Sequence, residues 1–186
     1  MNRKYLQKFQ IKDVVFLAIM SAVALATCAV MISLQPLIFG ISQLVTALQI
    51  GVFFAIGLYK VRKPGSLLIM ALMMGLIQLM MSPPMFLSSV LNGILIELIV
   101  LLLFRGYEKD TAVFVAAMLH TPLSLPFNYL YNRLVKGADS PLAAVADRAP
   151  LATVGMTLAV VAVSALGALI GIKIARELKK SGVLKK

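Results

Sequence analysis

The residues best suited to chemistry lie in one segment, Met118 to Arg133, which contains the single histidine of the chain. Pro122 and Pro126 lie in the same segment and are expected to bend a helix. Side chains spaced by three or four residues share one helix face, where an imidazole could act in catalysis, bind a ligand or metal, or bond a neighbouring helix. Four polar side chains have this spacing: His120, Ser124, Asn128 and Tyr131.

Other polar and methionine side chains lie near the ends of further apolar runs. Polar groups are costly inside a membrane, so each one requires a hydrogen-bond partner or a ligand. Methionine is flexible and polarizable, which suits an irregular apolar binding surface. We expect these side chains to line a pocket that opens outward, although hydrogen bonding between helices would also explain the polar ones. The expected pocket residues beyond the histidine row are Gln43, Gln78, Met81, Met85, Asn92 and Arg133.

Several catalytic classes lack their residues in this sequence. One histidine excludes motifs that need a His pair, and no GxxxxGK[ST] phosphate loop occurs. Glu97 is the one acid well inside an apolar run, and we expect it to have a structural or coupling role. A membrane enzyme with Glu97 and His120 as acid and base remains an alternative. The sequence favours a binding protein that works with partners, is not an enzyme and requires no cofactor.

Apolar runs of membrane-spanning length must position these residues. The chain has 186 residues, of which 61% are hydrophobic and 13% charged, whereas soluble domains are about 25% charged. Each run is close to the ~20 residues that a spanning helix needs. We therefore predict an all-α integral membrane protein with a single domain, residues 1–186. The six expected helices cover roughly 14–34, 41–59, 65–82, 86–104, 112–131 and 151–174.

The basic residues predict the orientation of these helices. If the N-terminus is cytoplasmic, the outer side holds three of the 18 Lys and Arg residues, Arg133, Lys136 and Arg148, and the inner side holds the remaining 15. Such a bias is the positive-inside pattern, and it explains the net charge of +11 without nucleic acid. We expect a multi-pass protein of a prokaryotic cell membrane with both termini cytoplasmic. The longest outer loop, 132–150, could be a lid or a simple connector.

Small residues recur at four-residue spacing in two of the expected helices. Such stripes let helix backbones approach closely in lipid. They would serve either packing inside the bundle or docking to another membrane subunit, and the sequence leaves both open. The stripes are Ala18, Ala22 and Ala26 in the first helix, and Gly167, Gly171 and Ala175 in the last.

These features together resemble the S-components, the substrate-binding membrane subunits of energy-coupling factor (ECF) transporters. The alanine stripe is similar to the small-residue motif through which S-components dock onto the transmembrane coupling protein. The segment "YKVRKPGSLLIMALMMGLIQLMMSPP", residues 59–84, looks like the corresponding region of the YkoE-type branch, whose members are assigned to thiamin precursors and related cofactors.

The resemblance implies a mechanism and partners. An S-component captures a micronutrient in an outward-facing pocket and docks on a coupling transmembrane protein carried by two ATPase subunits. It then topples in the bilayer and releases the nutrient inside. Ala18, Ala22 and Ala26 would be the docking residues, and the partners would supply the ATP hydrolysis that this chain has no motif for.

The expected ligand is haem or a related tetrapyrrole. His120 or a methionine could be an axial ligand of haem iron, and Arg133 or Lys136 could pair with the propionates. Thiamin, its hydroxymethylpyrimidine precursor or another vitamin is the alternative. A membrane enzyme and a scaffold without a ligand are the other classes left open.

Overall fold

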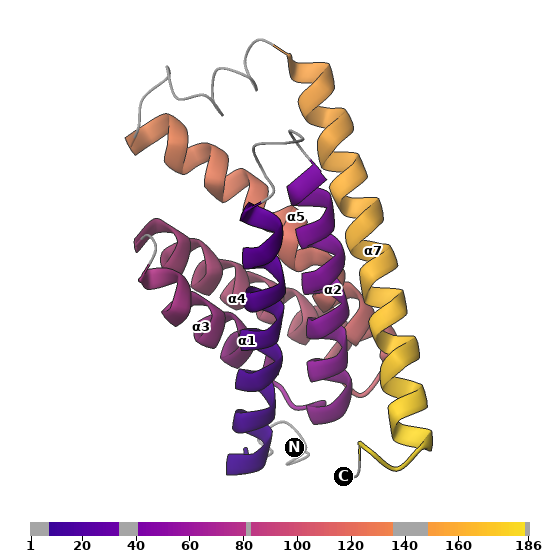
Figure 1. Ribbon diagram of the computed structural model, residues 1–186. Coiled ribbons are helices and arrows are strands. Elements are labelled where there is room, and N and C mark those ends of the chain that lie inside the picture. The colour runs from indigo at the N-terminus through magenta and orange to yellow at the C-terminus, as the bar shows by residue number, and fades with distance from the viewer. Residues whose placement is uncertain (1–7, 34–40, 81–82, 136–148, 185–186) are drawn as a thin grey trace.

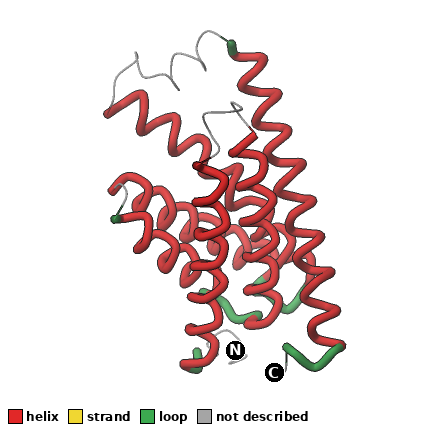
Figure 2. Tube along the Cα trace, in the orientation of Figure 1, coloured by secondary structure: helices red, strands yellow, loops and turns green. Residues whose placement is uncertain are grey.

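The computed structural model describes residues 8–33, 41–80, 83–135 and 149–184. In this part of the chain the regular elements are helices, with no strand (Figure 2). The elements are α1 (Ile11–Ser33), α2 (Ile41–Val61), α3 (Ser66–Leu79), α4 (Pro83–Phe104), α5 (Asp110–Val135) and α7 (Pro150–Lys180). The all-α fold predicted from the apolar runs is confirmed.

Five of the described helices are long and apolar enough to cross a membrane, and α3 is not. The run 65–82 was expected to span, but α3 has 14 residues, about 21 Å at 1.5 Å per residue, against a hydrocarbon core of about 30 Å. The expected start of the next helix at 86 is also wrong, because α4 begins at Pro83. Prolines fit the first turn of a helix, whereas in the interior they kink or break it, so Pro83 and Pro84 mark the start of a new helix.

The last helix is longer than its apolar run. We expected residues 151–174, whereas α7 extends from Pro150 to Lys180 and has 31 residues. Its length is about 46 Å at 1.5 Å per residue, which exceeds the thickness of the hydrocarbon core. The additional turns carry Arg176, Lys179 and Lys180, so the basic end of α7 continues beyond the apolar part.

The core lies around α2, which packs against α1, α5 and α7. Figure 1 shows α2 between α1 and α7, with α3 and α4 paired beside them. Burial of large apolar side chains fixes this arrangement. Fully buried examples are Leu17, Phe54, Leu58, Met70 and Tyr107.

Glycines bring α7 close to α2. A Cβ on Gly167 would lie 2.4 Å from the carbonyl oxygen of Leu48, and one on Gly171 would lie 2.4 Å from that of Val52. Carbon and oxygen do not approach this closely without bonding, so only glycine permits the contact. The glycine stripe of the last helix therefore serves packing inside the bundle.

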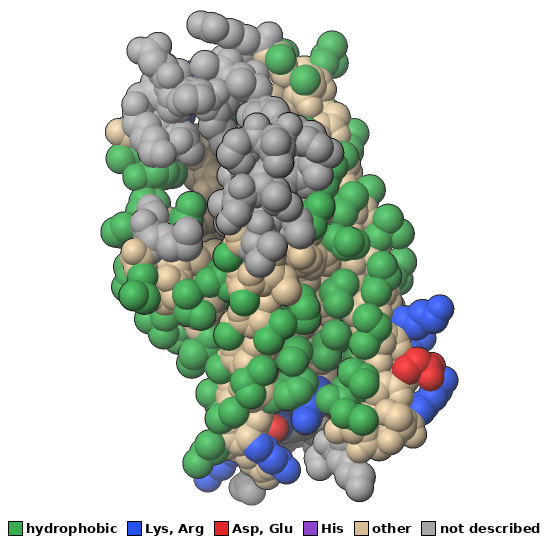
Figure 3. Space-filling model, viewed as in Figure 1, with side chains coloured by type: hydrophobic (Ala, Val, Ile, Leu, Met, Phe, Trp, Pro, Cys, Tyr) green, Lys and Arg blue, Asp and Glu red, His purple; other side chains and the backbone are tan. Residues whose placement is uncertain are grey.

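The surface divides into an apolar belt and a charged end. In the view of Figure 3 hydrophobic side chains cover the sides of the bundle, and Lys, Arg, Asp and Glu gather towards the end where α1 starts and α7 finishes. Exposed apolar residues would be costly in water, whereas lipid solvates them. This distribution agrees with a helical bundle embedded in a membrane.

Candidate ligand-binding site

Helix α5 continues through both of its prolines. Pro122 has no N–H, so the carbonyl of Met118 one turn earlier lacks its usual helical donor. The Ser164 hydroxyl of α7 donates to that carbonyl at 2.7 Å, which compensates for the missing bond. Figure 1 shows the second half of α5 leaning away from α7, as expected for a helix bent at proline.

Asn92 of α4 secures the same region of α5 from the other side. With its amide oriented so that both ends are bonded, Asn92 donates to the Leu123 carbonyl at 3.2 Å and accepts from the Ser124 N–H at 3.1 Å. The Asn92 side chain is fully buried. It therefore bonds the backbone of α5 where the prolines interrupt the helical pattern, and its main role is to position that helix.

A cavity of about 430 Å³ lies between the bent helix and its neighbours. Among the described residues its lining contains no Lys, Arg, Asp or Glu. Cavities of roughly 300–1,000 Å³ with mainly apolar walls and a few polar groups are typical of small-molecule sites. The lining residues are Leu25, Cys28, Ala29, Thr46, Ile50, Met74, Gln78, Met85, Ser88, Ser89, Asn92, His120, Thr121, Ser124 and Asn128.

His120 is a buried wall residue of this cavity. Its side chain is 4% exposed, and its ring meets that of Phe54 edge-on, with centroids 4.5 Å apart. Within the described part of the protein, neither ring nitrogen has a hydrogen-bond partner. Buried polar atoms are bonded in the great majority of cases, so two unpaired nitrogens on one buried ring are unusual.

The structure brings together most, but not all, of the side chains that the sequence nominated. Gln43, Tyr131 and Arg133 do not line the cavity, and Met81 lies outside the described residues. Arg133 is exposed and donates a hydrogen bond to the Tyr129 hydroxyl one turn away. The nominated residues that do line it are Gln78, Met85, Asn92, His120, Ser124 and Asn128.

Several lining residues have no distinguishing pattern in the sequence. Thr121 adjoins His120 in the sequence, but it does not belong to the row of polar residues spaced by three or four positions. Four further lining residues come from α1 and α2, and nothing in their type or spacing separates them from the residues around them. They are Leu25, Cys28, Thr46 and Ile50. Only the packed bundle identifies them.

Glu97 lies elsewhere, in a small buried network. Its two carboxylate oxygens accept from the Gly65 N–H at 2.6 Å and from the Tyr107 hydroxyl at 2.9 Å. Burial and the neighbouring Glu97 carboxylate raise the pKa of Tyr107 well above its ordinary value. Glu97 does not line the cavity, so the acid–base pair with His120 is not assembled there. In the described residues no group of three or more His, Cys, Asp or Glu could hold a metal ion.

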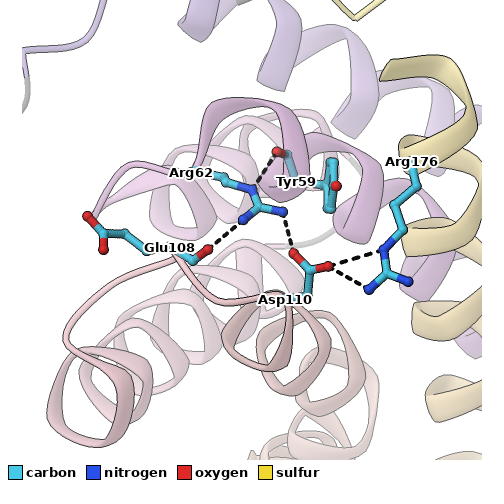
Figure 4. Close-up of polar contacts among 5 residues, drawn as sticks. All are labelled: Tyr59, Arg62, Glu108, Asp110 and Arg176. Carbon is cyan, nitrogen blue, oxygen red and sulfur yellow. Dashed lines mark hydrogen bonds and ion pairs between the residues drawn. The ribbon is translucent and has the colours of Figure 1, made fainter. Parts of the chain in front are cut away.

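Charged side chains connect three helices at the basic end of the bundle (Figure 4). Asp110 at the start of α5 accepts from Arg62, just after α2, and from Arg176 of α7 at 2.6 Å. Arg62 also donates to the carbonyls of Tyr59 and Glu108. The network joins the ends of α2, α5 and α7.

The alanine stripe of α1 differs from the glycine stripe of α7. Ala22 and Ala26 are exposed and Ala18 is half-buried, whereas Gly167, Gly171 and Ala175 are buried. The stripe on α1 is therefore only partly used inside this chain, and Ala22 and Ala26 remain on the surface.

Comparison with known proteins defines first the class and then the family. The fold matches a solved structure described as "Crystal structure of an S-component of ECF transporter", with a TM-score of 0.67, 21% identity, and coverage of 95% of this chain and 89% of that one. The protein thus has an S-component fold. It belongs to the family described as hypothetical bacterial integral membrane protein (Trep_Strep), whose model matches residues 11–180. No curated protein matches the chain. Assignment to the YkoE-type branch stays a prediction.

Proposed function

We propose that this protein is the substrate-binding S-component of an ECF-type importer. The observation that carries the proposal is the cavity of about 430 Å³ inside an S-component fold. The protein binds a micronutrient from outside, docks on a coupling transmembrane protein, topples and releases its cargo to the cytoplasm. Two partner ATPases supply the energy.

The exposed alanines of α1 support the docking step. Small side chains allow two helices to approach closely, and close packing is the main attraction between helices in lipid. Ala22 and Ala26 lie on the surface one turn apart, so a partner helix could contact the α1 backbone there. A bulky side chain at this strip would hold such a helix away.

Co-purification of the tagged protein with its coupling protein and ATPases tests the proposal. We expect Ala22→Trp to reduce the recovered coupling protein at least about tenfold, because the helix contact is lost. Leu158→Trp is the matched control, since Leu158 is also exposed, at 64%, but lies on α7. If Ala22→Trp assembles as well as the wild type, α1 is not the docking helix. If the wild-type protein recovers no coupling protein, it is not an ECF subunit.

Haem stays one candidate ligand. His120, Met74 and Met85 line the cavity and offer nitrogen or sulfur to haem iron. Of the two cations expected to pair with the propionates, Arg133 is not in the lining and Lys136 lies outside the described residues. Thiamin or its pyrimidine precursor is the other candidate from the sequence. The described lining contains no Lys, Arg, Asp or Glu and favours an uncharged ligand.

A further inference from the structure

We propose that the cavity takes an uncharged molecule, mainly apolar, that carries an amide- or imide-like group with both hydrogen-bond donors and acceptors. The inference rests on the proposed function, because it names the class of nutrient that the S-component would bind. Three independent properties of the described lining support it: its charge, its unsatisfied polar atoms and its apolar wall.

Charge is the first property. The described lining has no Lys, Arg, Asp or Glu. A ligand ion that entered would lose water without gaining a counter-charge, and such burial is strongly unfavourable in a low-dielectric interior. His120 is buried against Phe54, and the described lining has no acid that would stabilise an imidazolium, so burial favours the neutral imidazole. A neutral ligand avoids this desolvation cost.

Unsatisfied hydrogen-bonding groups are the second property. Both ring nitrogens of His120, the Thr121 hydroxyl and the Gln78 amide oxygen have no partner within the described residues. Neutral imidazole offers one donor and one acceptor, a hydroxyl offers both, and an amide oxygen accepts. A ligand group that both donates and accepts would satisfy these three side chains, whereas a hydrocarbon would leave them unpaired.

Asn92 shows that the unsatisfied set is selective. It is buried in the same lining, yet both ends of its amide bond the α5 backbone. Asn92 is therefore not available to a ligand, whereas the unpartnered atoms of His120, Thr121 and Gln78 are.

The apolar wall is the third property. Leu25, Ile50, Met74 and Met85 face the cavity from α1, α2, α3 and α4. They would contact the remainder of the ligand and favour apolar over highly hydroxylated molecules. Methionines can also adjust to ring edges and irregular shapes.

Matched pairs of compounds that differ mainly in charge provide the test. Purified full-length protein in nanodiscs is titrated with two pairs: lipoamide and lipoate, and biotinamide and biotin. Mass spectrometry also identifies any compound released from the protein as purified. We expect any compound released from the purified protein to be uncharged. In the titrations we expect the neutral member of a pair to bind at least about 100-fold more tightly than its charged partner.

Variants connect that binding to the named side chains. We expect His120→Ala and Gln78→Leu each to weaken binding of the preferred compound about tenfold or more, because a buried hydrogen bond is lost. Gln49→Leu is the matched control: Gln49 also has an unpartnered buried amide oxygen but does not line the cavity. Two lining variants are used so that a folding defect in one does not decide the result.

The outcomes separate the ligand class from the proposed function. Tight binding of a charged compound overturns the neutral class and leaves the S-component standing; haem, detected by a Soret band that shifts in His120→Ala, is such a compound. Equal loss in Gln49→Leu and the two lining variants overturns the assignment to these side chains. If neither the extract nor the panel yields a bound compound, the ligand site itself is overturned, whereas failure to recover the coupling protein refutes the ECF function.

Discussion

Asn92 and Ser164 show how single polar residues maintain a bent helix in lipid. A proline inside a helix leaves a carbonyl unbonded, and no water is present in the hydrocarbon core to satisfy it. Ser164 bonds the Met118 carbonyl, and Asn92 bonds the backbone of Leu123 and Ser124. The hydrogen bonds from these two side chains stabilise the bent helix. The cavity lies between this bent helix and its neighbours.

Glu97 likewise stabilises backbone structure, at the α2–α3 and α4–α5 turns. Gly65 precedes α3 with a φ of 91°, a conformation that glycine adopts without strain. Glu97 accepts from the Gly65 N–H and from Tyr107, so one carboxylate holds the α2–α3 and α4–α5 turns to α4. We expected a structural or coupling role for Glu97, and these contacts agree with the structural one.

The ionisation of Tyr107 should report this network. Burial and Glu97 raise its pKa above the ordinary value near 10. The folded state therefore keeps its proton at pH values where the unfolded state loses it. The resulting stability is complete below the unfolded pKa and falls as the pH rises above it. We expect Tyr107→Phe to lessen this alkaline loss of stability, as measured by thermal unfolding against pH.

Tyrosinate absorbance gives a second measurement on the same pair of proteins. The wild type minus Tyr107→Phe difference should titrate later than free tyrosine. A difference that titrates at or below the ordinary pKa would contradict the buried Glu97–Tyr107 contact.

At the scale of elements, the contact between α2 and α7 depends on glycines, which have no side chain. A Cβ on Gly171 would lie 2.4 Å from the Val52 carbonyl oxygen and 2.8 Å from the Cβ of Ala55. Close backbone approach increases dispersion contacts, which are the main attraction between helices in lipid. The α2–α7 pair is thus the tightest described helix contact for which glycine is required.

Gly171→Ala should loosen this pair. Overpacking of a close contact costs typically about 1–3 kcal/mol, so we expect a lower unfolding temperature in detergent. Gly155→Ala is the control on the same helix, since its Cβ would meet nothing within 4 Å. That control should be neutral or stabilising by up to about 1 kcal/mol, because alanine favours helix. Equal destabilisation by both substitutions would show that the close contact at Gly171 is not the cause of the lost stability.

The elements also show what a sequence can and cannot predict for such a fold. Apolar runs predict the helices well, because lipid requires continuous hydrogen-bonded backbone. The short α3 was missed because its apolar run continues to Met81, and only Pro83 and Pro84 mark the break. Lining residues were harder, since lipid-facing and core-facing sides are both apolar and hydrophobicity does not fix helix rotation. His120 and Asn128 were found through polar spacing, while Gln43 is on an exposed face.

For the whole molecule, the cavity and the charged network lie towards opposite ends. Gln78 is at the end of α3 and Met85 at the start of α4, and both line the cavity. The other ends of these two helices adjoin Gly65 and Arg105. Arg62 and Asp110 of the charged network lie a few residues from them in the sequence. If the positive-inside pattern holds, the charged network is cytoplasmic and the cavity lies towards the outside, where an importer must collect its ligand.

Cysteine labelling tests this orientation. Cys28 is the single cysteine and is buried, so Cys28→Ser provides a background for Ala149→Cys before α7 and Ser181→Cys after it. We expect a membrane-impermeant maleimide to label Ala149→Cys in intact cells and Ser181→Cys only after permeabilisation. Lys109→Cys, in the α4–α5 turn, should behave like Ser181→Cys. The reverse pattern would turn the cavity towards the cytoplasm and contradict uptake from outside, because the bundle would then present its charged network to the supply of nutrient.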